Sequence, residues 1–186
     1  MKQRNILRFF VSQTGEISWI LCDMDASAHQ GEQIGKKTSS GYAPPELAAR
    51  KFSCTCGGTI DNDNPCTKCA LENAEPSFDV WALGVILFEL CAGRTLFAQD
   101  TNNDELVEFS DKTRLCVWQT ISDEELAPVL KEAQCERGIA DAAKALIRWC
   151  LKGSPSERPT VQEILSHGFL DQAAGAVQEM PMRCAR

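Results

Sequence analysis

Four of the ten cysteines form a group of side chains whose types and spacing could do chemistry. They are arranged as Cys54-x-Cys56 and Cys66-x-x-Cys69, with nine residues between the two pairs. Four thiolates on two turns could bind Zn²⁺ tetrahedrally and stabilise a segment that has almost no apolar residues of its own. The second pair has the usual ligand spacing, whereas the first is one residue shorter. Free surface thiols or a redox pair explain the same residues, so both interpretations stay open.

The composition is typical of a soluble globular chain. Its 186 residues are 44% hydrophobic and 24% charged, which fits one domain with or without a small appendage. A formal net charge of −7 argues against nucleic-acid and anionic-lipid partners. The longest apolar stretch, Val80–Ala92, is shorter than the roughly 20 residues that cross a bilayer, and the N-terminus lacks the apolar run of a signal peptide. We therefore expect an intracellular, cytoplasmic protein without a membrane partner.

The elements that must position any functional residue begin with two β-prone runs, Asn5–Val11 and Ile17–Asp23. They flank a polar segment with a glycine, a pattern that predicts a β-hairpin. Residues 26–41 are polar and lack a sustained period, which favours an exposed loop. Residues 51–76 are irregular and carry the clustered cysteines, so we interpret them as an insertion.

The remaining sequence predicts helices. The apolar residues that follow Asp79 surround the helix axis, so this helix should lie at the centre of the core, and Ser77 could cap it. Further helices are expected over residues 122–136, over residues 138–152 and from Thr160 onward. The first and last of these begin with the spacing of a capping box.

Several blocks, in the family's order, resemble the C-terminal lobe of a eukaryotic protein kinase. Gly41-Tyr42-Ala43-Pro44-Pro45-Glu46 resembles Gly-Tyr-x-Ala-Pro-Glu at the end of the kinase activation segment. Asp79-Val80-Trp81-Ala82-Leu83-Gly84 resembles the start of the family's long hydrophobic helix, and residues 146–170 resemble its closing helices.

This resemblance implies an α+β, mainly α fold, namely a protein-kinase-like C-terminal lobe in which an N-terminal β-hairpin is followed by a helical bundle. The N-terminal lobe is absent from the sequence. Residues 1–170 would be a partial kinase domain with a Cys-rich insertion at 51–76, and residues 171–186 would be a tail.

The first residues gain a meaning from the same resemblance. Lys2-Gln3-Arg4-Asn5 resembles the kinase catalytic-loop stretch Asp-x-Lys-x-x-Asn, in the form found in Ser/Thr kinases. Lys2 would neutralise charge on the transferred phosphoryl group, Asn5 and Asp23 would hold Mg²⁺, and Ser39 would line the substrate pocket. The family's proton-accepting aspartate would stand immediately before Met1 and is absent from this chain.

Two neighbours of Asp23 depart from the family's Asp-Phe-Gly. Met24 replaces the phenylalanine and keeps an apolar plug, whereas Asp25 replaces the glycine and removes easy access to positive φ. Considered alone, Asp23 could cap a turn, Lys2 and Asn5 could be surface residues, and Ser39 could belong to any polar loop.

The resemblance also implies residues that hold the site without doing chemistry. Glu46 and Arg158 would form an ion pair between the activation segment and the closing helices. Asp79 would accept hydrogen bonds from the catalytic-loop backbone, and Trp81 would pack in the core.

Two functional hypotheses follow. The first is a Ser/Thr protein kinase domain fragment that uses ATP and Mg²⁺ on a protein hydroxyl in the full domain, and that is inactive as an isolated chain without its N-terminal lobe. The second is a pseudokinase-like module that binds a regulatory protein partner through an insertion stabilised by Zn²⁺. Nucleotide binding discriminates between them, since only the first needs a working ATP site.

Overall fold

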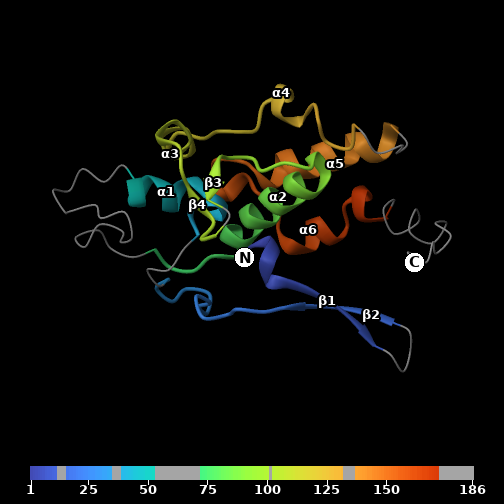
Figure 1. Cartoon of the computed structure of the whole chain (residues 1–186), viewed down its shortest axis with the longest axis horizontal. Helices are drawn as coiled ribbons and strands as arrows, with labels where there is room; N and C mark the ends of the chain where they lie inside the picture. Colours follow the sequence, from blue (N-terminus) through green and yellow to red (C-terminus); the bar gives the residue numbers. More distant parts are fainter. Residues whose placement is uncertain (12–15, 35–38, 53–71, 101, 132–136, 172–186) are drawn as a thin grey trace.

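The computed structural model describes residues 1–11, 16–34, 39–52, 72–100, 102–131 and 137–171. Within these ranges a β-hairpin precedes a mainly helical body, as the sequence predicts (Figure 1). The four clustered cysteines lie outside the described residues. Within the described part, none of the helices is both long and apolar enough to cross a bilayer.

The hairpin consists of β1 (Ile6–Val11) and β2 (Glu16–Leu21), paired antiparallel from Ile6 opposite Leu21 onward. It projects from the helical body (Figure 1). Opposite residues share a face of the sheet, and large apolar side chains stand exposed on both faces. These side chains are Leu7, Phe9, Phe10, Ile17, Trp19, Ile20 and Leu21. Within the described ranges, neither apolar face of this two-stranded sheet has the cover that such faces normally have.

Helix α2 (Pro76–Ala92) runs through the centre of the body (Figure 1). Its buried residues occupy most of the circumference, and the partly buried Leu83 and Leu87 extend this burial to nearly all sides, as the apolar sequence predicts. The predicted cap at Ser77 is wrong, because the helix begins two residues earlier than this cap implies, with Glu75 as N-cap and Pro76 in the first turn. Proline is suited to that position, since the amide hydrogen that it lacks would have no intrahelical partner. Gly93, at φ 68°, ends the helix in the left-handed conformation.

Helix α5 (Arg137–Cys150) packs directly against α2, close to the range predicted for it. Val80, Leu146, Cys150 and Ile164 form one buried apolar cluster at this contact. Burial raises the pKa of the Cys150 thiol to about 12, so this cysteine acts as a small apolar side chain.

A second contact joins α1 (Pro45–Phe52) to α3 (Phe109–Cys116). Helix α1 includes Lys51 and Phe52, so the first residues of the expected insertion are helical. Pro76, the last residue of that range, already belongs to α2.

The short helices α4 (Asp123–Leu126) and α6 (Val161–Leu165) both begin with the predicted capping boxes. The helix expected over 122–136 is much shorter than predicted, with four residues in α4. Pro128 follows almost at once, and a proline inside a longer helix would remove a hydrogen bond and clash with the preceding turn.

Gly84 sets the distance between α2 and α5. A Cβ at this position would lie 2.7 Å from Cβ of Cys150 and 2.9 Å from Cδ2 of Leu151. We predict that Gly84→Ala lowers the free energy of unfolding by about 1–3 kcal/mol, the cost of overpacking a core, as measured by urea denaturation. The matched control is Gly138→Ala in α5, where the added methyl meets no atom within 4 Å. It should be neutral or stabilising, because alanine favours a helix over glycine. Equal losses in both variants would contradict this account of the helix contact.

Candidate functional site

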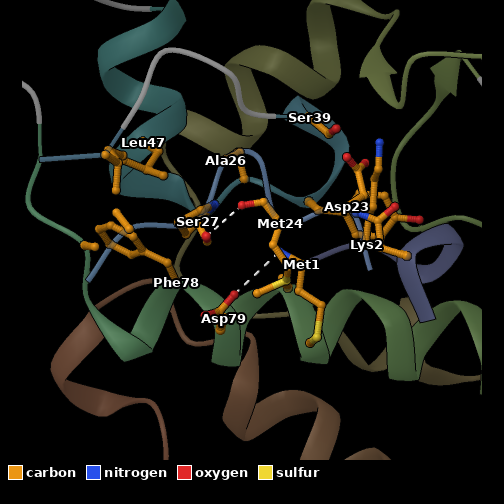
Figure 2. Close-up of a pocket in the computed structure, with 18 of the residues that line it drawn as sticks. Met1, Lys2, Asp23, Met24, Ala26, Ser27, Ser39, Leu47, Phe78 and Asp79 are labelled. Atoms are coloured by element: carbon orange, nitrogen blue, oxygen red, sulfur yellow. Dashed lines mark hydrogen bonds and ion pairs between the residues drawn. The ribbon is translucent and has the colours of Figure 1, made fainter. Parts of the chain in front are cut away.

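A cavity of about 880 Å³ lies beside the start of α2 and the base of the hairpin. It is lined by five of the residues that the sequence singles out, Lys2, Asn5, Asp23, Ser39 and Asp79. In Figure 2, Lys2 and Asp23 are seen at one end of the cavity, and Leu47 and Phe78 at the other. The structure therefore gathers the predicted chemical residues around one space, whereas Glu46, Arg158 and Trp81 lie outside its wall.

The hairpin positions Asn5 and Asp23. The backbone amide of Cys22 donates to the carbonyl of Asn5 at 2.8 Å, immediately beyond the pair formed by Ile6 and Leu21. Residues at the start of β1 and at the end of β2 are thus held next to each other. Asp23 has φ 59°, a left-handed conformation that is unusual for a residue with a side chain and that tends to occur at functional sites.

Lys2 is paired in the structure. Its Nζ lies 3.2 Å from Oδ2 of Asp104, a residue that sequence reasoning did not identify. Asp104 belongs to the turn between β3 (Gln99–Asp100) and β4 (Glu105–Leu106). Apart from its place in a polar and acidic run, nothing in the sequence distinguishes it.

Asp79 and Met24, which both line the cavity, differ in their contacts: Asp79 is paired with a charged group, whereas the Met24 side chain is exposed. The carboxylate of Asp79 lies 3.5 Å from the terminal nitrogen of Met1, which joins the start of α2 to the start of the chain (Figure 2). Met24 is 54% exposed, so its side chain does not form the apolar plug that we expected. Its carbonyl accepts a hydrogen bond from the Ser27 hydroxyl at 2.7 Å.

The segment that follows Ser39 is bound to β4 by buried and partly buried polar contacts. The Ser40 hydroxyl accepts from the amide of Leu106 at 2.8 Å and donates to the carboxylate of Glu105. Lys51 Nζ lies 3.1 Å from the same carboxylate. Glu105 and Lys51 both line the cavity, and neither was predicted.

A second polar contact fixes Tyr42 against the last turns of α2. The Tyr42 hydroxyl donates to Oε2 of Glu89 at 2.8 Å, and Nε2 of Gln99 donates to Oε1 of Glu89 at 3.0 Å. Burial raises the pKa of Glu89, and the two hydrogen bonds offset part of that rise. Burial also raises the pKa of Tyr42 far above its usual value, so its hydroxyl remains a donor.

The loop that walls the cavity pairs with the segment that leads into α2. The amide of Gly31 donates to the carbonyl of Ala74 at 2.9 Å, and the amide of Ala74 donates to the carbonyl of Glu32 at 2.7 Å. Glu72 forms an ion pair with Arg50 in α1. These contacts connect the predicted activation segment to the residues on both sides of 53–71.

Glu46 and Arg158 form the ion pair expected from the resemblance. Nη1 and Nη2 of Arg158 donate to the two carboxylate oxygens of Glu46 at 2.8 and 2.7 Å. The Arg158 side chain is completely buried, and it also donates to the carbonyls of Ser77 and Gly153. Its guanidinium lies 5.2 Å from the centre of the Trp81 ring, which is itself buried.

The donor set at the cavity suits Mg²⁺ bound together with phosphate. Asn5 offers an amide oxygen and Asp23 a carboxylate, the hard ligands that this cation prefers. Among the described residues, no three His, Cys, Asp or Glu side chains converge in a way that could hold a metal. A cation here would therefore need phosphate oxygens and water in addition to the protein, which is the usual manner of Mg²⁺ binding with nucleotides.

Comparison with known proteins agrees with the resemblance seen in the sequence. A family model described as "Protein kinase domain" matches residues 1–170. The TBC domain-containing protein kinase-like protein of Mus musculus is 42% identical over 97 residues, which are 48% of this chain and 10% of that protein. The meiosis-specific serine/threonine-protein kinase mek1 of Schizosaccharomyces pombe is 26% identical over 168 residues, which are 90% of this chain and 31% of that protein.

The solved structure of the Cydia pomonella granulovirus kinase PK-1 has the same fold. The match has a TM-score of 0.54 at 20% identity and covers 91% of this chain but 52% of that one. The chain thus spans about half of this solved kinase and smaller fractions of the two relatives named above.

The ion pair between Glu46 and Arg158 should matter strongly for stability. We predict that Glu46→Ala lowers the free energy of unfolding by about 3–5 kcal/mol, because Arg158 would remain buried without its partner. Urea denaturation followed by circular dichroism measures this loss. Arg148→Met, which removes an ion pair with the exposed Asp123, is the control and should have only a small effect. If both variants lose the same free energy of unfolding, the buried pair does not stabilise the fold more than an exposed one.

Proposed function

The chain belongs to the protein kinase family, whose domain model covers residues 1–170, and on this premise we propose that it supplies the C-terminal lobe of a Ser/Thr kinase domain. One observation carries the proposal: Lys2, Asn5, Asp23 and Ser39 line the same cavity. These are the residues that the family resemblance relates to phosphate, metal and substrate. In this proposal, the lobe binds Mg²⁺ and ATP and receives a protein hydroxyl.

Each residue has a distinct role in this proposal. Lys2 places a positive charge at the phosphoryl group that is transferred, because phosphoryl transfer depends mainly on positioning and on electrostatic stabilisation. The amide oxygen of Asn5 and the carboxylate of Asp23 hold Mg²⁺, which, when bound, neutralises charge on the phosphates. Ser39 lines the side of the cavity where the substrate hydroxyl enters.

Activity needs a second part of the domain in this proposal. The chain spans about half of the solved kinase that it resembles, and the hairpin exposes apolar side chains on both faces. Exposed apolar area of this kind usually marks a surface that another element covers. We assign the N-terminal lobe of the kinase domain to this surface, and the chain without that lobe is catalytically inactive.

A pseudokinase-like interaction module is the alternative. Some of the relatives have "protein kinase-like" in their names, and Asp25 stands where the family has a flexible glycine. The four clustered cysteines could give such a module a zinc-stabilised surface for a protein partner. This alternative rests on the sequence alone, apart from the ion pair between Arg50 and Glu72, which brings the two sides of segment 53–71 together.

Nucleotide binding tests the main proposal. We predict that Mg²⁺ with ATP raises the melting temperature of the chain, since a ligand at 100 times its Kd stabilises a protein by about 2.7 kcal/mol. Asp23→Asn and Asn5→Ala should remove most of this rise, whereas Asp141→Asn, on the exposed side of α5, should keep it. Absence of any shift in the native chain at millimolar Mg²⁺ and ATP would refute nucleotide binding and favour the interaction module.

Metal analysis tests the alternative. If the cysteines form a closed zinc site, the purified chain contains one equivalent of zinc by elemental analysis, and Cys66→Ser with Cys69→Ser removes it. Cys22→Ser, at a single cysteine outside the cluster, should leave the zinc content unchanged. A chain that is free of metal after purification with added zinc would exclude this site.

A further inference from the structure

We propose that Asp104 is the positioning residue of the cavity, since its carboxylate holds Lys2 and its backbone holds the segment that includes Ser39. The inference rests on the proposed function, in which Lys2 contacts phosphate, and adds to it a residue that the family resemblance does not assign. Two independent contacts carry it, one through the side chain of Asp104 and one through its carbonyl.

The first contact is an ion pair at the edge of the cavity. Nζ of Lys2 lies 3.2 Å from Oδ2 of Asp104, and Nε of Arg4 lies 3.9 Å from Oδ1. Asp104 is only 4% exposed. A carboxylate buried to this extent is costly unless a cation compensates it, so the pairing restrains the flexible side chain of Lys2.

The second contact links Asp104 to the segment on the substrate side. The Asp104 carbonyl accepts a hydrogen bond from the amide of Gly41 at 2.9 Å. The next two residues, which form β4, bind Ser40 through the Glu105 carboxylate and the Leu106 amide. A Cβ on Gly41 would overlap the side chain of Gln99 and lie 3.0 Å from the Asp104 carbonyl, so the two segments are closely fitted.

The backbone of the turn between β3 and β4 determines where Asp104 points. Asp104 has φ 60°, in the left-handed region, and its amide donates to the carbonyl of Asp100 at 2.8 Å. Aspartate and asparagine adopt this conformation more readily than other residues with a side chain, because their short polar groups can hydrogen-bond locally. The turn thereby presents the Asp104 carboxylate to Lys2 and its carbonyl to Gly41.

Asp104 acts through Lys2 rather than on a substrate. Lys2 and Glu105 line the cavity, but Asp104 does not, so its carboxylate is not in reach of a bound hydroxyl. The chemical benefit is preorganisation: an ammonium that is already held at the cavity wall loses less freedom when a phosphate binds.

The variant Asp104→Asn tests the charge of Asp104 without changing the size of its side chain. Asparagine has the same size and tolerates positive φ as well as aspartate does, so the turn should keep its conformation while Lys2 loses its charged partner. The matched control is Asp100→Asn in the same turn. The Asp100 carboxylate accepts from the amide of Asn102 at 2.9 Å, a bond that an asparagine oxygen can also accept.

The experiment uses the whole chain with its lysines reductively methylated with ¹³C, so that each dimethylamino group gives an NMR signal. Lys2→Met identifies the signal of Lys2 by its disappearance. We expect Asp104→Asn to shift that signal and Asp100→Asn to leave it in place, while circular dichroism shows the native fold in both variants. A Lys2 signal that does not respond to Asp104→Asn would overturn the proposal.

The second measurement is the Kd for Mg²⁺ with ATP. Asp104→Asn should weaken binding about tenfold, the equivalent of ~1.4 kcal/mol, and should have no further effect when Lys2 is already methionine. An equal loss in the Lys2→Met background would mean that Asp104 acts through the fold, which also overturns the proposal. If the native chain binds no nucleotide, the proposed function fails, and the Lys2 signal still decides whether Asp104 holds Lys2.

Discussion

The burial of α2 on nearly all sides is the constraint on which the rest of the structure depends. A helix that is apolar around its whole circumference must be surrounded, and α5, the buried residues of the C-terminal segments and the segment before α1 provide that cover. The few polar groups of α2 then occupy defined places. Asp79 in its first turn reaches the cavity, and Glu89 near its end receives the hydroxyl of Tyr42. One buried helix therefore sets the position of a cavity residue at its start and of the partner of Tyr42 near its end.

Two sets of polar contacts fix the segments around the cavity to the packed helices. The bidentate pair of Arg158 and Glu46 joins the closing segments to the start of α1, and it is completed by backbone carbonyls that accept the remaining guanidinium hydrogens. On the other side, the β3–β4 turn binds Ser40 and Gly41 through a hydroxyl, a carboxylate and the backbone. Both are buried or partly buried contacts, so the loss of one partner leaves a polar group without compensation. The segment between them, which ends the predicted activation segment, is consequently held at both ends.

The hairpin has a different character from the helical body. Its strands are joined by regular backbone pairing, but the apolar side chains on both faces lack cover within the described residues. Its base is nevertheless well placed, because the bond between Cys22 and Asn5 closes the ladder beside the cavity. The base of the hairpin thus holds Asn5 beside Cys22 at the cavity, whereas its strands carry exposed apolar side chains.

The amino-acid sequence by itself determined the elements whose signal is local. The hairpin followed from two β-prone runs around a glycine, α2 and α5 from the distribution of apolar residues, and both capping boxes from a spacing of three residues. The site residues Lys2, Asn5, Asp23 and Ser39 came from a resemblance to a family, and only the folded chain brought them around one cavity. The sequence analysis failed at Ser77, because the adjacent proline already starts the helix, and at Met24, whose side chain is exposed.

Tertiary structure alone decided the partners of the site residues. Three partners come from segments that are far from Lys2 and Ser39 along the chain. Asp104 pairs with Lys2, and Glu105 and Lys51 line the cavity. Glu105, which also binds Ser40, is 65 residues from it. No periodicity or short motif marks such residues, because their role arises only when the folded chain brings the turn between β3 and β4 against Lys2. Local patterns predict which backbone conformation a segment adopts, since that depends on near neighbours. Which charge compensates Lys2 depends on the packing of the whole chain and could be read only from the structure, whereas the pair of Glu46 and Arg158 followed from the family resemblance.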